Sequence, residues 1–488
     1  MSIPLPVGSY VAADPTASCK RLVNVMSEPS PQDSVLAELK SGNPSQESVP
    51  AYLRRWAGIT QFATNGTNDP VRGLWTMQGV LYAVIGPTLY KVDSVGTLTQ
   101  LGTGIVGSTF VRMTDNTACL VILVPNTTYA WTYCPNASGQ AAFLPLAGSL
   151  FTTYGAIDCK FLDSYIVFLA SNGRLFYNDD GQVISGQNQI TFTTNASFPR
   201  EFGTDLFVGI GVEHREITNF GTLTSEGYIN VGNPVGTPFS TAPQTFMEMG
   251  CHPQAGYSVA TQDQTLIWVA NDKTVRRKNG QTPQRISNSG IEAILEHANL
   301  QGSYALTPNV AGHPVWVFVM PAAFRTIAYD CLTSEWFEIE SYNLGYWRAL
   351  SYVNAYGKQF VGDSQSGKIG YLDTSVFTEF GNTLVASFTT QPIYSEHNRI
   401  VNRRLELVIS TGEGGFTGAV LSLYVSDDSG NTFRGFPLRN LGSTGSFFVR
   451  VIWFNLGQTR NRVYKFSTSD PTPTFTVNIT TDVEMCKW

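Results

Sequence analysis

The residues whose types suit acid–base chemistry lie together in the run Glu213-His214-Arg215-Glu216. A carboxylate beside a histidine can act as a general acid or base, although a charged turn or a salt bridge between subunits is a more common use of such a cluster. The five histidines never occur two to a motif, so a metal site would need unrelated loops to converge. The sequence contains no P-loop, H-E-x-x-H or G-x-S-x-G pattern. We therefore expect no enzymatic activity, no cofactor, no metal ion and no small-molecule substrate.

One polar run matches a known structural pattern. The segment from Ser426 to Phe433 fits S-x-D-x-G-x-T-[WF] and resembles the Asp-box of sialidases and other β proteins. The resemblance implies that Asp428 accepts hydrogen bonds from backbone N–H groups of its own hairpin, while Gly430 takes a turn conformation that a Cβ atom would oppose. Ser426, Asp428, Gly430, Thr432 and Phe433 are then a structural turn. A sialidase would carry several boxes and an arginine triad, whereas this sequence has one box.

Basic residues are concentrated near the C-terminus. Residues 391–488 contain ten Lys plus Arg and eight Asp plus Glu, a net charge of +2, whereas the rest of the chain has 21 and 29, a net charge of −8. The densest set consists of Arg399, Arg403, Arg404, Arg460 and Arg462. Because arginine suits protein interfaces, we predict that this set contacts another subunit. A phosphate-binding face is the alternative, but no aromatic residues are interleaved on a basic stripe.

The elements that position these residues are expected to be short β-strands. An apolar strand, a tight turn and a more polar strand recur, most clearly from Leu81, Tyr165 and Leu266. Asn-Gly and Asp-Gly pairs occur in the turns, and they favour hairpins because both central turn positions take a positive φ. Weaker copies begin at Cys119, Leu206, Val315 and Gln359. The seven starts are on average about 46 residues apart, close to the length of a four-stranded propeller blade.

The repeat predicts an all-β protein with a β-propeller of six or seven blades over residues 61–380. A single blade has two apolar faces, and stacking blades around an axis buries both. An irregular set of sandwiches is the alternative, because hairpins at this spacing also occur there. One short helix is predicted after Asn288, since Ile291, Ile294 and Leu295 share one helical face. We expect it in a loop between blades.

The segments before and after the predicted propeller differ from it in composition and in strand pattern. Residues 381–488 contain six longer strands of alternating polarity separated by Gly-rich turns, which predicts a C-terminal β-sandwich or jelly-roll-like domain. Residues 1–60 are rich in Pro, Ser and Gln and show no sustained period. This segment is predicted to be an extended N-terminal arm.

Composition limits the partners and the compartment. The 488 residues carry a net charge of −6, which gives no overall attraction to nucleic acid or anionic membranes. The N-terminus lacks a secretory pattern, and every apolar run is far shorter than the roughly 20 residues that span a bilayer, so we expect a soluble, non-exported chain. No two cysteines form a C-x-x-C pair, and we expect reduced, mostly buried thiols. The seven are Cys19, Cys119, Cys134, Cys159, Cys251, Cys331 and Cys486.

Several segments together resemble one family. They are Asn24-Val25, the run AYLRRWAGIT from Ala51 to Thr60, the helical run SGIEAIL from Ser289, and the C-terminal run from Ser426 to Pro473. These segments are similar to parts of the packaged-DNA stabilisation proteins of short-tailed bacteriophages, also called tail hub or nozzle proteins. Ala57 stands where proline is usual in that family.

The resemblance implies a structural protein of the virion tail that is assembled in the host cytoplasm. It implies a hexameric ring below the portal and its head-to-tail adaptor, which extends the DNA channel, helps to retain packaged DNA and carries the tail needle, tailspikes or fibres. Double-stranded DNA would pass through the lumen without specific binding. The alternative function, from another class, is a carbohydrate-binding or sialidase-like propeller.

Overall fold

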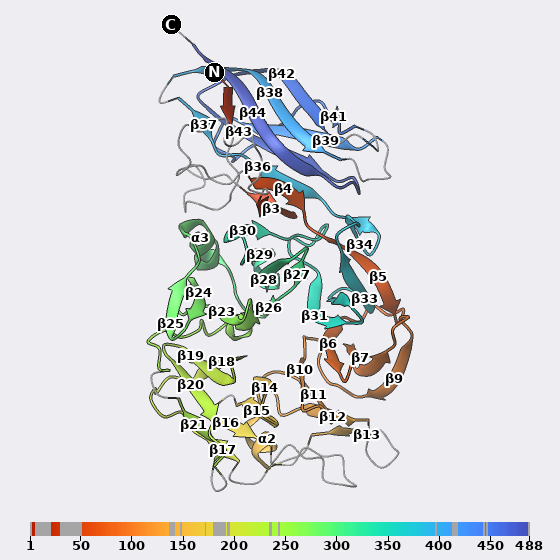
Figure 1. Cartoon of the computed structure of the whole chain (residues 1–488), viewed down its shortest axis with the longest axis vertical. Helices are drawn as coiled ribbons and strands as arrows, with labels where there is room; N and C mark the ends of the chain where they lie inside the picture. Colours follow the sequence, from red (N-terminus) through yellow and green to blue (C-terminus); the bar gives the residue numbers. More distant parts are fainter. Residues whose placement is uncertain are drawn as a thin grey trace.

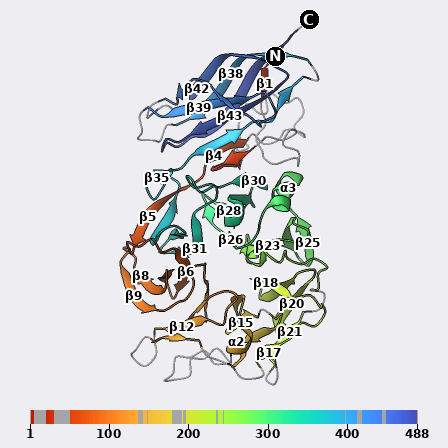
Figure 2. The same ribbon diagram turned by 180° about the vertical axis from the view of Figure 1, so that it is seen from behind.

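Within the residues that the structure describes, short apolar strands joined by tight turns form five four-stranded sheets, and two further groups of four strands belong to larger sheets. In the computed structural model these seven sets of four strands are arranged around a common axis as the blades of a β-propeller, with a C-terminal domain beside the ring (Figure 1; seen from behind in Figure 2). The predicted all-β fold of a propeller and a sandwich is confirmed. The described residues are 2–4, 21–29, 51–135, 142–146, 149–170, 172–178, 192, 196–233, 237–242, 245–395, 398–411, 418–442, 445 and 448–486.

The blades follow one another in chain order. Blade 1 contains β6 (Val71–Met77), β7 (Val80–Ile85), β8 (Thr88–Val92) and β9 (Leu98–Thr103); blade 2 contains β10 (Arg112–Asp115), β11 (Leu120–Leu123), β12 (Ala130–Cys134) and β13 (Ala142–Pro145); blade 3 contains β14 (Asp158–Leu162), β15 (Tyr165–Leu169), β16 (Leu175–Tyr177) and β17 (Ser197–Phe198). Blade 4 contains β18 (Phe207–Glu213), β19 (Glu216–Gly221), β20 (Ser225–Asn230) and β21 (Phe239–Thr241); blade 5 contains β22 (Ala260–Gln262), β23 (Thr265–Val269), β24 (Val275–Asn279) and β25 (Thr282–Arg285). Blade 6 contains β26 (Tyr304–Leu306), β28 (His313–Met320), β29 (Arg325–Asp330) and β30 (Glu335–Glu338), and β27 (Asn309–Val310) also pairs with β28. Blade 7 contains β31 (Ala349–Ala355), β32 (Lys358–Asp363), β33 (Lys368–Asp373) and β5 (Gly58–Thr64).

The apolar runs of the sequence mark the second strand of most blades. The first strands of neighbouring blades, such as β6, β10 and β14, contact one another around the axis. The second strand of each blade lies between two other strands of its own sheet. Strands β11, β15 and β23 are therefore almost entirely buried. Only the start at Leu206 falls before a first strand, β18, which explains the irregular spacing of the repeat around it.

The ring is closed by β5, which precedes blade 1 in the chain but belongs to blade 7. Strand β5 is the outermost strand of blade 7 and pairs antiparallel with β33, so that Leu372 lies opposite Ile59 and Ile369 opposite Ala63. Both β5 side chains are buried. Strand β34 (Thr378–Glu379), which pairs with β35 (Asn382–Thr383), covers the free edge of β5. Closure therefore joins residues that are about 300 positions apart in the chain.

The C-terminal domain consists of two packed sheets. One has the strand order β3-β4-β44-β38-β42, with β1 also on β44. The other contains β36, β43, β39 and β40, with the short strands β37 and β41 at its margins. Their facing side chains include Leu405 and Trp453 on the first sheet and Leu423 and Phe466 on the second, and all four are buried. The strands are β1 (Ser2–Pro4), β3 (Val25–Pro29), β4 (Ala51–Arg55), β36 (Ala386–Thr389), β37 (Ile393–Tyr394), β38 (Ile400–Ser410), β39 (Val420–Ser426), β40 (Arg434–Gly435), β41 (Arg439–Asn440), β42 (Val449–Thr459), β43 (Asn461–Thr468) and β44 (Phe475–Met485).

The described part of the N-terminal segment is not a free arm. Strands β3 and β4 belong to the sandwich, while β2 (Leu22–Val23) pairs with β30 of blade 6 on one side and with β36 of the sandwich on the other. One continuous sheet therefore runs from blade 6 into the C-terminal domain. The Pro-, Ser- and Gln-rich sequence carries no local sign of these strands, because β2 pairs only with strands more than 300 residues away and the β3–β4 pair joins the sandwich through β44, more than 400 residues away. Residues 5–20 and 30–50 lie outside the described part of the chain.

The predicted helix is confirmed as α3 (Ser289–His297), between blades 5 and 6. The side chain of Asn288 accepts a hydrogen bond from the N–H of Ile291 at 3.0 Å, as an N-cap does. Ile291 and Leu295 are buried against the neighbouring blades. The other described helices are α2 (Ser149–Tyr154) and two single 3₁₀ turns at Gly256–Ser258 and Pro321–Ala323. None of the described helices is long and apolar enough to cross a membrane.

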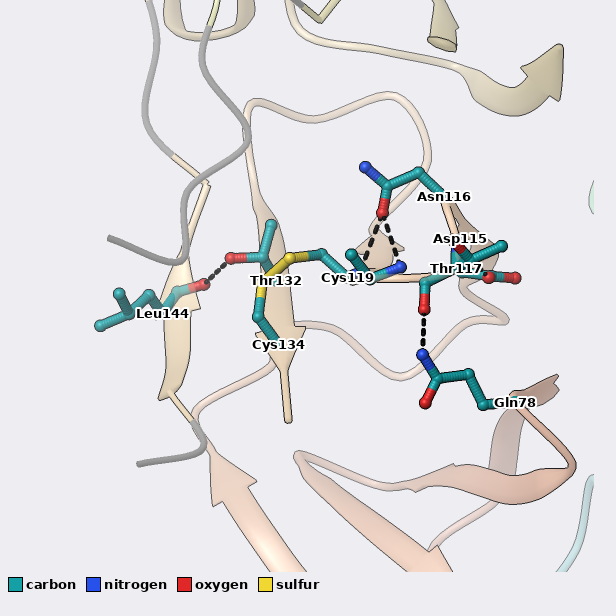
Figure 3. Close-up of a disulfide and its surroundings, with 9 residues drawn as sticks. Gln78, Asp115, Asn116, Thr117, Cys119, Thr132, Cys134 and Leu144 are labelled. Carbon is teal, nitrogen blue, oxygen red and sulfur yellow. Dashed lines mark hydrogen bonds between the residues drawn. A yellow bond between two sulfur atoms is a disulfide. The ribbon is translucent and has the colours of Figure 1, made fainter. Parts of the chain in front are cut away.

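The expectation that all the thiols are reduced is wrong for one pair. Cys119 and Cys134 form a disulfide in blade 2 (Figure 3). They lie opposite each other because Leu120 of β11 pairs with Tyr133 of β12, one position further along. No spacing motif announces such a pair, since its geometry depends on strand register. Cys159 and Cys251 are buried free thiols, Cys331 and Cys486 are partly exposed free thiols, and Cys19 lies outside the described residues.

Candidate functional site

Four of the five arginines predicted to contact another subunit lie at one end of the sandwich. Arg399 precedes β38, Arg403 and Arg404 are on β38, and Arg460 is in the turn between β42 and β43. Arg399, Arg403 and Arg460 are exposed. The pairing of Ile400 with both Thr459 and Met485 brings these segments together. We name this end of the domain, where the described chain stops, the distal tip (Figure 1).

The prediction has to be corrected for Arg462. Its side chain is fully buried, and its Nε donates a hydrogen bond to Asp427 Oδ1 at 2.6 Å while Nη1 donates to the carbonyl of Leu456 at 2.9 Å. Arg462 therefore holds the β42–β43 hairpin against the turn that carries Asp427. The sequence could not separate it from its neighbours, because Arg460 and Arg462 are both in a polar, arginine-rich turn region.

The two arginines of β38 are partly neutralised within the chain. Arg403 pairs with Glu484 of β44, and Arg404 pairs with Glu406 and lies 3.8 Å from Asp482. By contrast, no ion pair between described residues includes Arg399 or Arg460. These two are consequently the charges of the tip that remain available to an acidic partner.

Apolar side chains that the sequence analysis missed lie beside these arginines. Tyr394 is 68% exposed and pairs across β37 with Asn461, next to Arg460. Met485 is 59% exposed, and its sulfur lies 3.4 Å from the hydroxyl of Ser395. Exposed Tyr, Met and Arg are the residue types enriched in protein interfaces. Which side chains of β37 and β44 point outward depends on the strand register, and the sequence alone does not give that register.

The Asp-box forms a hydrogen-bonded turn. Asp428 Oδ1 accepts the N–H of Thr432 at 2.8 Å and the hydroxyl of Ser426 at 2.6 Å, while Oδ2 accepts the hydroxyl of Thr432 at 2.6 Å. Gly430 has a φ of +95° and donates its N–H to Ser426. These bonds lower the pKa of Asp428 to about 2. Phe433 lies under the ammonium of Lys465, 5.7 Å from its ring centre. The hydrogen bonds of the Asp428 carboxylate thus all lie within the turn.

The acid–base cluster of the sequence analysis links two blades. Lys278 of β24 is buried, and its ammonium lies 2.8 Å from Glu213 and 2.7 Å from Glu216, at the two ends of the β18–β19 turn. His214 and Arg215 occupy that turn with positive φ values. The two carboxylates therefore share one buried cation of the next blade. Among the described residues, no three His, Cys, Asp or Glu side chains come together as a metal site.

The centre of the propeller is closed by aromatic side chains from different blades. The ring of Phe110, before β10 of blade 2, lies 4.8 Å from that of Tyr257, before blade 5, and 5.7 Å from that of Tyr304 of blade 6. Tyr257 also donates its hydroxyl to the carbonyl of Ile157, next to blade 3. Contacts between blades on opposite sides of a ring cross its axis. A cavity of about 230 Å³ lies between innermost strands of several blades.

A second apolar surface lies on blade 4 and its flanking loops. Phe202, Leu206, Leu223 and Phe246 are exposed. The rings of Phe202 and Phe246 are 6.2 Å apart, and the N–H of Thr222 donates to the carbonyl of Leu206. The exposed carboxylates of Glu201 and Glu248 flank these residues in the sequence. We name this surface the blade 4 patch; blade 4 lies in the half of the ring away from the sandwich (Figure 1).

Comparison with protein families gives two matches. A model described as the β-propeller of bacteriophage P22 Gp10 matches residues 39–377, and a model described as its β-sandwich matches residues 386–484. No curated protein matches the chain in sequence.

Comparison with solved structures gives remote matches, each at 10% identity. The computationally designed Ika8 protein has a TM-score of 0.34 over 64% of this chain and 99% of its own. A chain of the mitotic checkpoint complex has a TM-score of 0.39 over 68% of this chain and 96% of its own. The extracellular domain of a hybrid two-component system from B. thetaiotaomicron has a TM-score of 0.40 over 65% of this chain and 40% of its own.

Proposed function

The chain belongs to the bacteriophage P22 Gp10 family of phage tail proteins that stabilise packaged DNA, and we propose that it is the tail hub that forms a hexameric ring below the portal and its adaptor. The family membership carries this proposal. In this role the ring extends the DNA channel, helps to retain the genome and anchors distal parts such as a needle, tailspikes or fibres. The protein is a component of the virion, and we propose that it assembles in the host cytoplasm.

The closed propeller supports a channel that lies outside the axis of each propeller. The rings of Phe110, Tyr257 and Tyr304 span the propeller axis, and the cavity of about 230 Å³ that Phe110 and Tyr304 help to line has no room for a DNA duplex. The lumen must then lie between subunits, with each propeller serving as a solid piece of the wall. A propeller without an open axis can therefore form part of the channel wall.

The net charge supports passage of DNA without binding. Each phosphate that a protein neutralises adds salt-dependent affinity, and this would slow ejection. A chain with a net charge of −6 does not attract DNA overall. We propose that retention is steric: the ring helps by carrying a distal plug that blocks the exit, and its wall does not bind the DNA.

The described surfaces offer the two unlike halves that a ring contact needs. A closed ring requires a heterologous interface, in which one surface meets a different surface of the next copy. The distal tip combines apolar side chains with the arginines Arg399 and Arg460, and the blade 4 patch combines apolar side chains with Glu201 and Glu248. The two surfaces are complementary in charge and both expose apolar area. We propose that they meet in the ring.

Glycoside hydrolysis receives no support from the propeller centre. That reaction normally uses a pair of carboxylates on either side of the bond that breaks. None of the described residues that line the cavity is Asp or Glu. The described lining of this cavity therefore lacks the carboxylate pair that the sialidase-like alternative would need there.

Charge exchange tests the proposed interface. Arg399→Glu with Arg460→Glu in one chain, and Glu201→Arg with Glu248→Arg in another, should each abolish ring formation on the portal–adaptor complex, as measured by mass photometry. Combining all four changes in one chain should restore it, because every interface then pairs opposite charges again. Lys91→Glu, on the exposed face of β8, is the matched control and should assemble normally. Normal rings from both double variants would exclude this interface, whereas failure of the unchanged chain to form rings would exclude the hub function.

A further inference from the structure

The cavity at the propeller centre has an unusual charge balance. It is lined by the innermost strands of several blades, and its lining includes Arg72 of β6, Arg112 of β10 and Lys160 of β14. No carboxylate is among the described lining residues. The chain as a whole is acidic, so this local excess of positive charge is not a consequence of composition.

Arg112 is neutralised by a carboxylate behind the cavity wall. Its Nε and Nη2 donate to the two oxygens of Asp158, each at 2.8 Å, and Asp158 is buried. The guanidinium also lies 5.6 Å from the ring centre of Tyr257. In such a bidentate ion pair the two opposite charges neutralise each other.

Arg72 is buried without a carboxylate. Its guanidinium donates to the backbone carbonyls of Gly86, Ile105, Val106 and Thr109 at 2.6–3.2 Å, and none of the ion pairs between described residues includes it. Burial lowers its pKa to about 10. Carbonyl dipoles satisfy its donors but leave its net charge in place.

Lys160 is the remaining cation and has only a distant partner. Its ammonium lies 3.8 Å from Asp158 Oδ2, and that carboxylate is already engaged by Arg112. The side chain is 29% exposed, and the cavity is the space that it borders. Burial lowers the pKa of Lys160, in part offset by Asp158. Among the described residues, the cluster thus contains three cations and the single carboxylate of Asp158, which leaves it with a net charge of +2.

We propose that the cavity binds one small oxyanion, of the phosphate or carboxylate class, through the ammonium of Lys160. Opposite charge in a partly desolvated space is worth more than in water, and a cavity of about 230 Å³ accommodates an ion of this size. The aromatic contacts across the axis exclude a DNA backbone, so the ligand is a free ion. Binding neutralises the centre of the ring. The inference rests on the propeller alone and does not depend on the proposed tail function.

The test uses inorganic phosphate and the full chain. Phosphate is titrated at constant ionic strength, made up with chloride, while the melting temperature is followed by differential scanning fluorimetry and binding by ³¹P NMR line broadening. Lys160→Met removes the charge and keeps a side chain of similar length. Lys91→Met is the matched control, because Lys91 is exposed on the outer part of blade 1.

The unchanged chain and Lys91→Met should show a saturable rise in melting temperature and broadened phosphate signals. Lys160→Met should bind phosphate with at least a tenfold weaker apparent affinity, so that both effects are absent over the range that saturates the unchanged chain. Without phosphate, this variant should melt higher than the unchanged chain. Lys160→Arg should retain binding. Equal titrations for Lys160→Met and the unchanged chain would overturn the proposal, as would the absence of saturable binding in the unchanged chain. Competition by a short DNA duplex at equal phosphate concentration would also overturn it, because the site would then be open to a backbone.

Discussion

At the scale of single residues, Asn24 shows how one side chain joins the two domains. It is buried with a φ of +54°, a conformation that asparagine tolerates better than most residues. Its Nδ2 donates to the carbonyls of Glu340 and Val385 at 2.7 and 2.8 Å, and its Oδ1 accepts the N–H of Glu340 at 3.0 Å. Three backbone groups from the end of blade 6 and from the linker to the sandwich thus depend on this amide.

Asn24→Ala should destabilise the protein by about 3 kcal/mol, because it leaves several buried backbone groups without partners. Urea unfolding followed by intrinsic fluorescence measures the change. Asn382→Ala, at an exposed position of β35, should stay within about 0.5 kcal/mol of the unchanged chain. Equal effects at the two positions would show that Asn24 is not a joint.

Glu379 gives a pH dependence with a definite sign. Its side chain is buried beside the closing strand β5, and burial raises its pKa from 4.5 to about 7, against the lowering effects of Ser341 and Arg348. A group whose pKa is higher in the folded state stabilises the fold fully below pH 4.5, and this contribution is lost as the pH rises towards 7 and above. The loss is at most about 3 kcal/mol.

Glu379→Gln should remove this part of the pH dependence. The difference in the free energy of unfolding between the variant and the unchanged chain, measured in urea at pH 5 and at pH 8, should shift in favour of the variant at pH 8. Using the difference cancels the titration of every other group. A difference that does not change with pH would show that Glu379 titrates at its ordinary value.

At the scale of elements, blade 2 is held by a covalent link between adjacent strands. Cys119 and Cys134 are 1% and 2% exposed. The N–H of Cys119 donates to Asn116 Oδ1, and Gln78 of blade 1 donates to the carbonyl of Thr117 in the same turn (Figure 3). The disulfide therefore fixes the β11–β12 pair at the point where blades 1 and 2 meet.

Reduction of the disulfide should cost about 3 kcal/mol, the value that loop closure gives for a sequence separation of 15 residues. Thermal unfolding of the chain after refolding with and without reductant measures this cost. A double variant, Cys119→Ser with Cys134→Ser, should melt at the lower temperature and be insensitive to reductant. Identical melting of the oxidised and reduced chains would contradict the prediction.

The repeated blades could be predicted from the sequence because each hairpin carries its own turn signals and a buried second strand. The closure by β5 and the bridge by β2 could not, since both strands pair with residues about 300 or more positions away and have no local signature. The same reason explains the mixed result for the arginines. Composition located the right region, but the burial of Arg462 and the exposure of Tyr394 depend on strand register.

At the scale of the whole molecule, the N-terminal strand β2 connects the propeller to the sandwich by pairing with a strand of each. Arg55 adds to this joint, since its buried guanidinium donates to the carbonyls of Leu384 and Thr472 at 2.7 and 2.9 Å. The long axis of the molecule runs from the distal tip to blades 2, 3 and 4 (Figure 1). A long subunit with unlike surfaces towards its two ends is suited to a ring in which each copy contacts the next.

The most direct test of the proposed hub is cryo-electron microscopy of the chain bound to its portal and adaptor, with packaged DNA. The proposal predicts a sixfold ring whose lumen continues the portal channel, with DNA density between the subunits and none on the axis of any propeller. DNA density through a propeller axis, or single copies attached outside the channel, would contradict it.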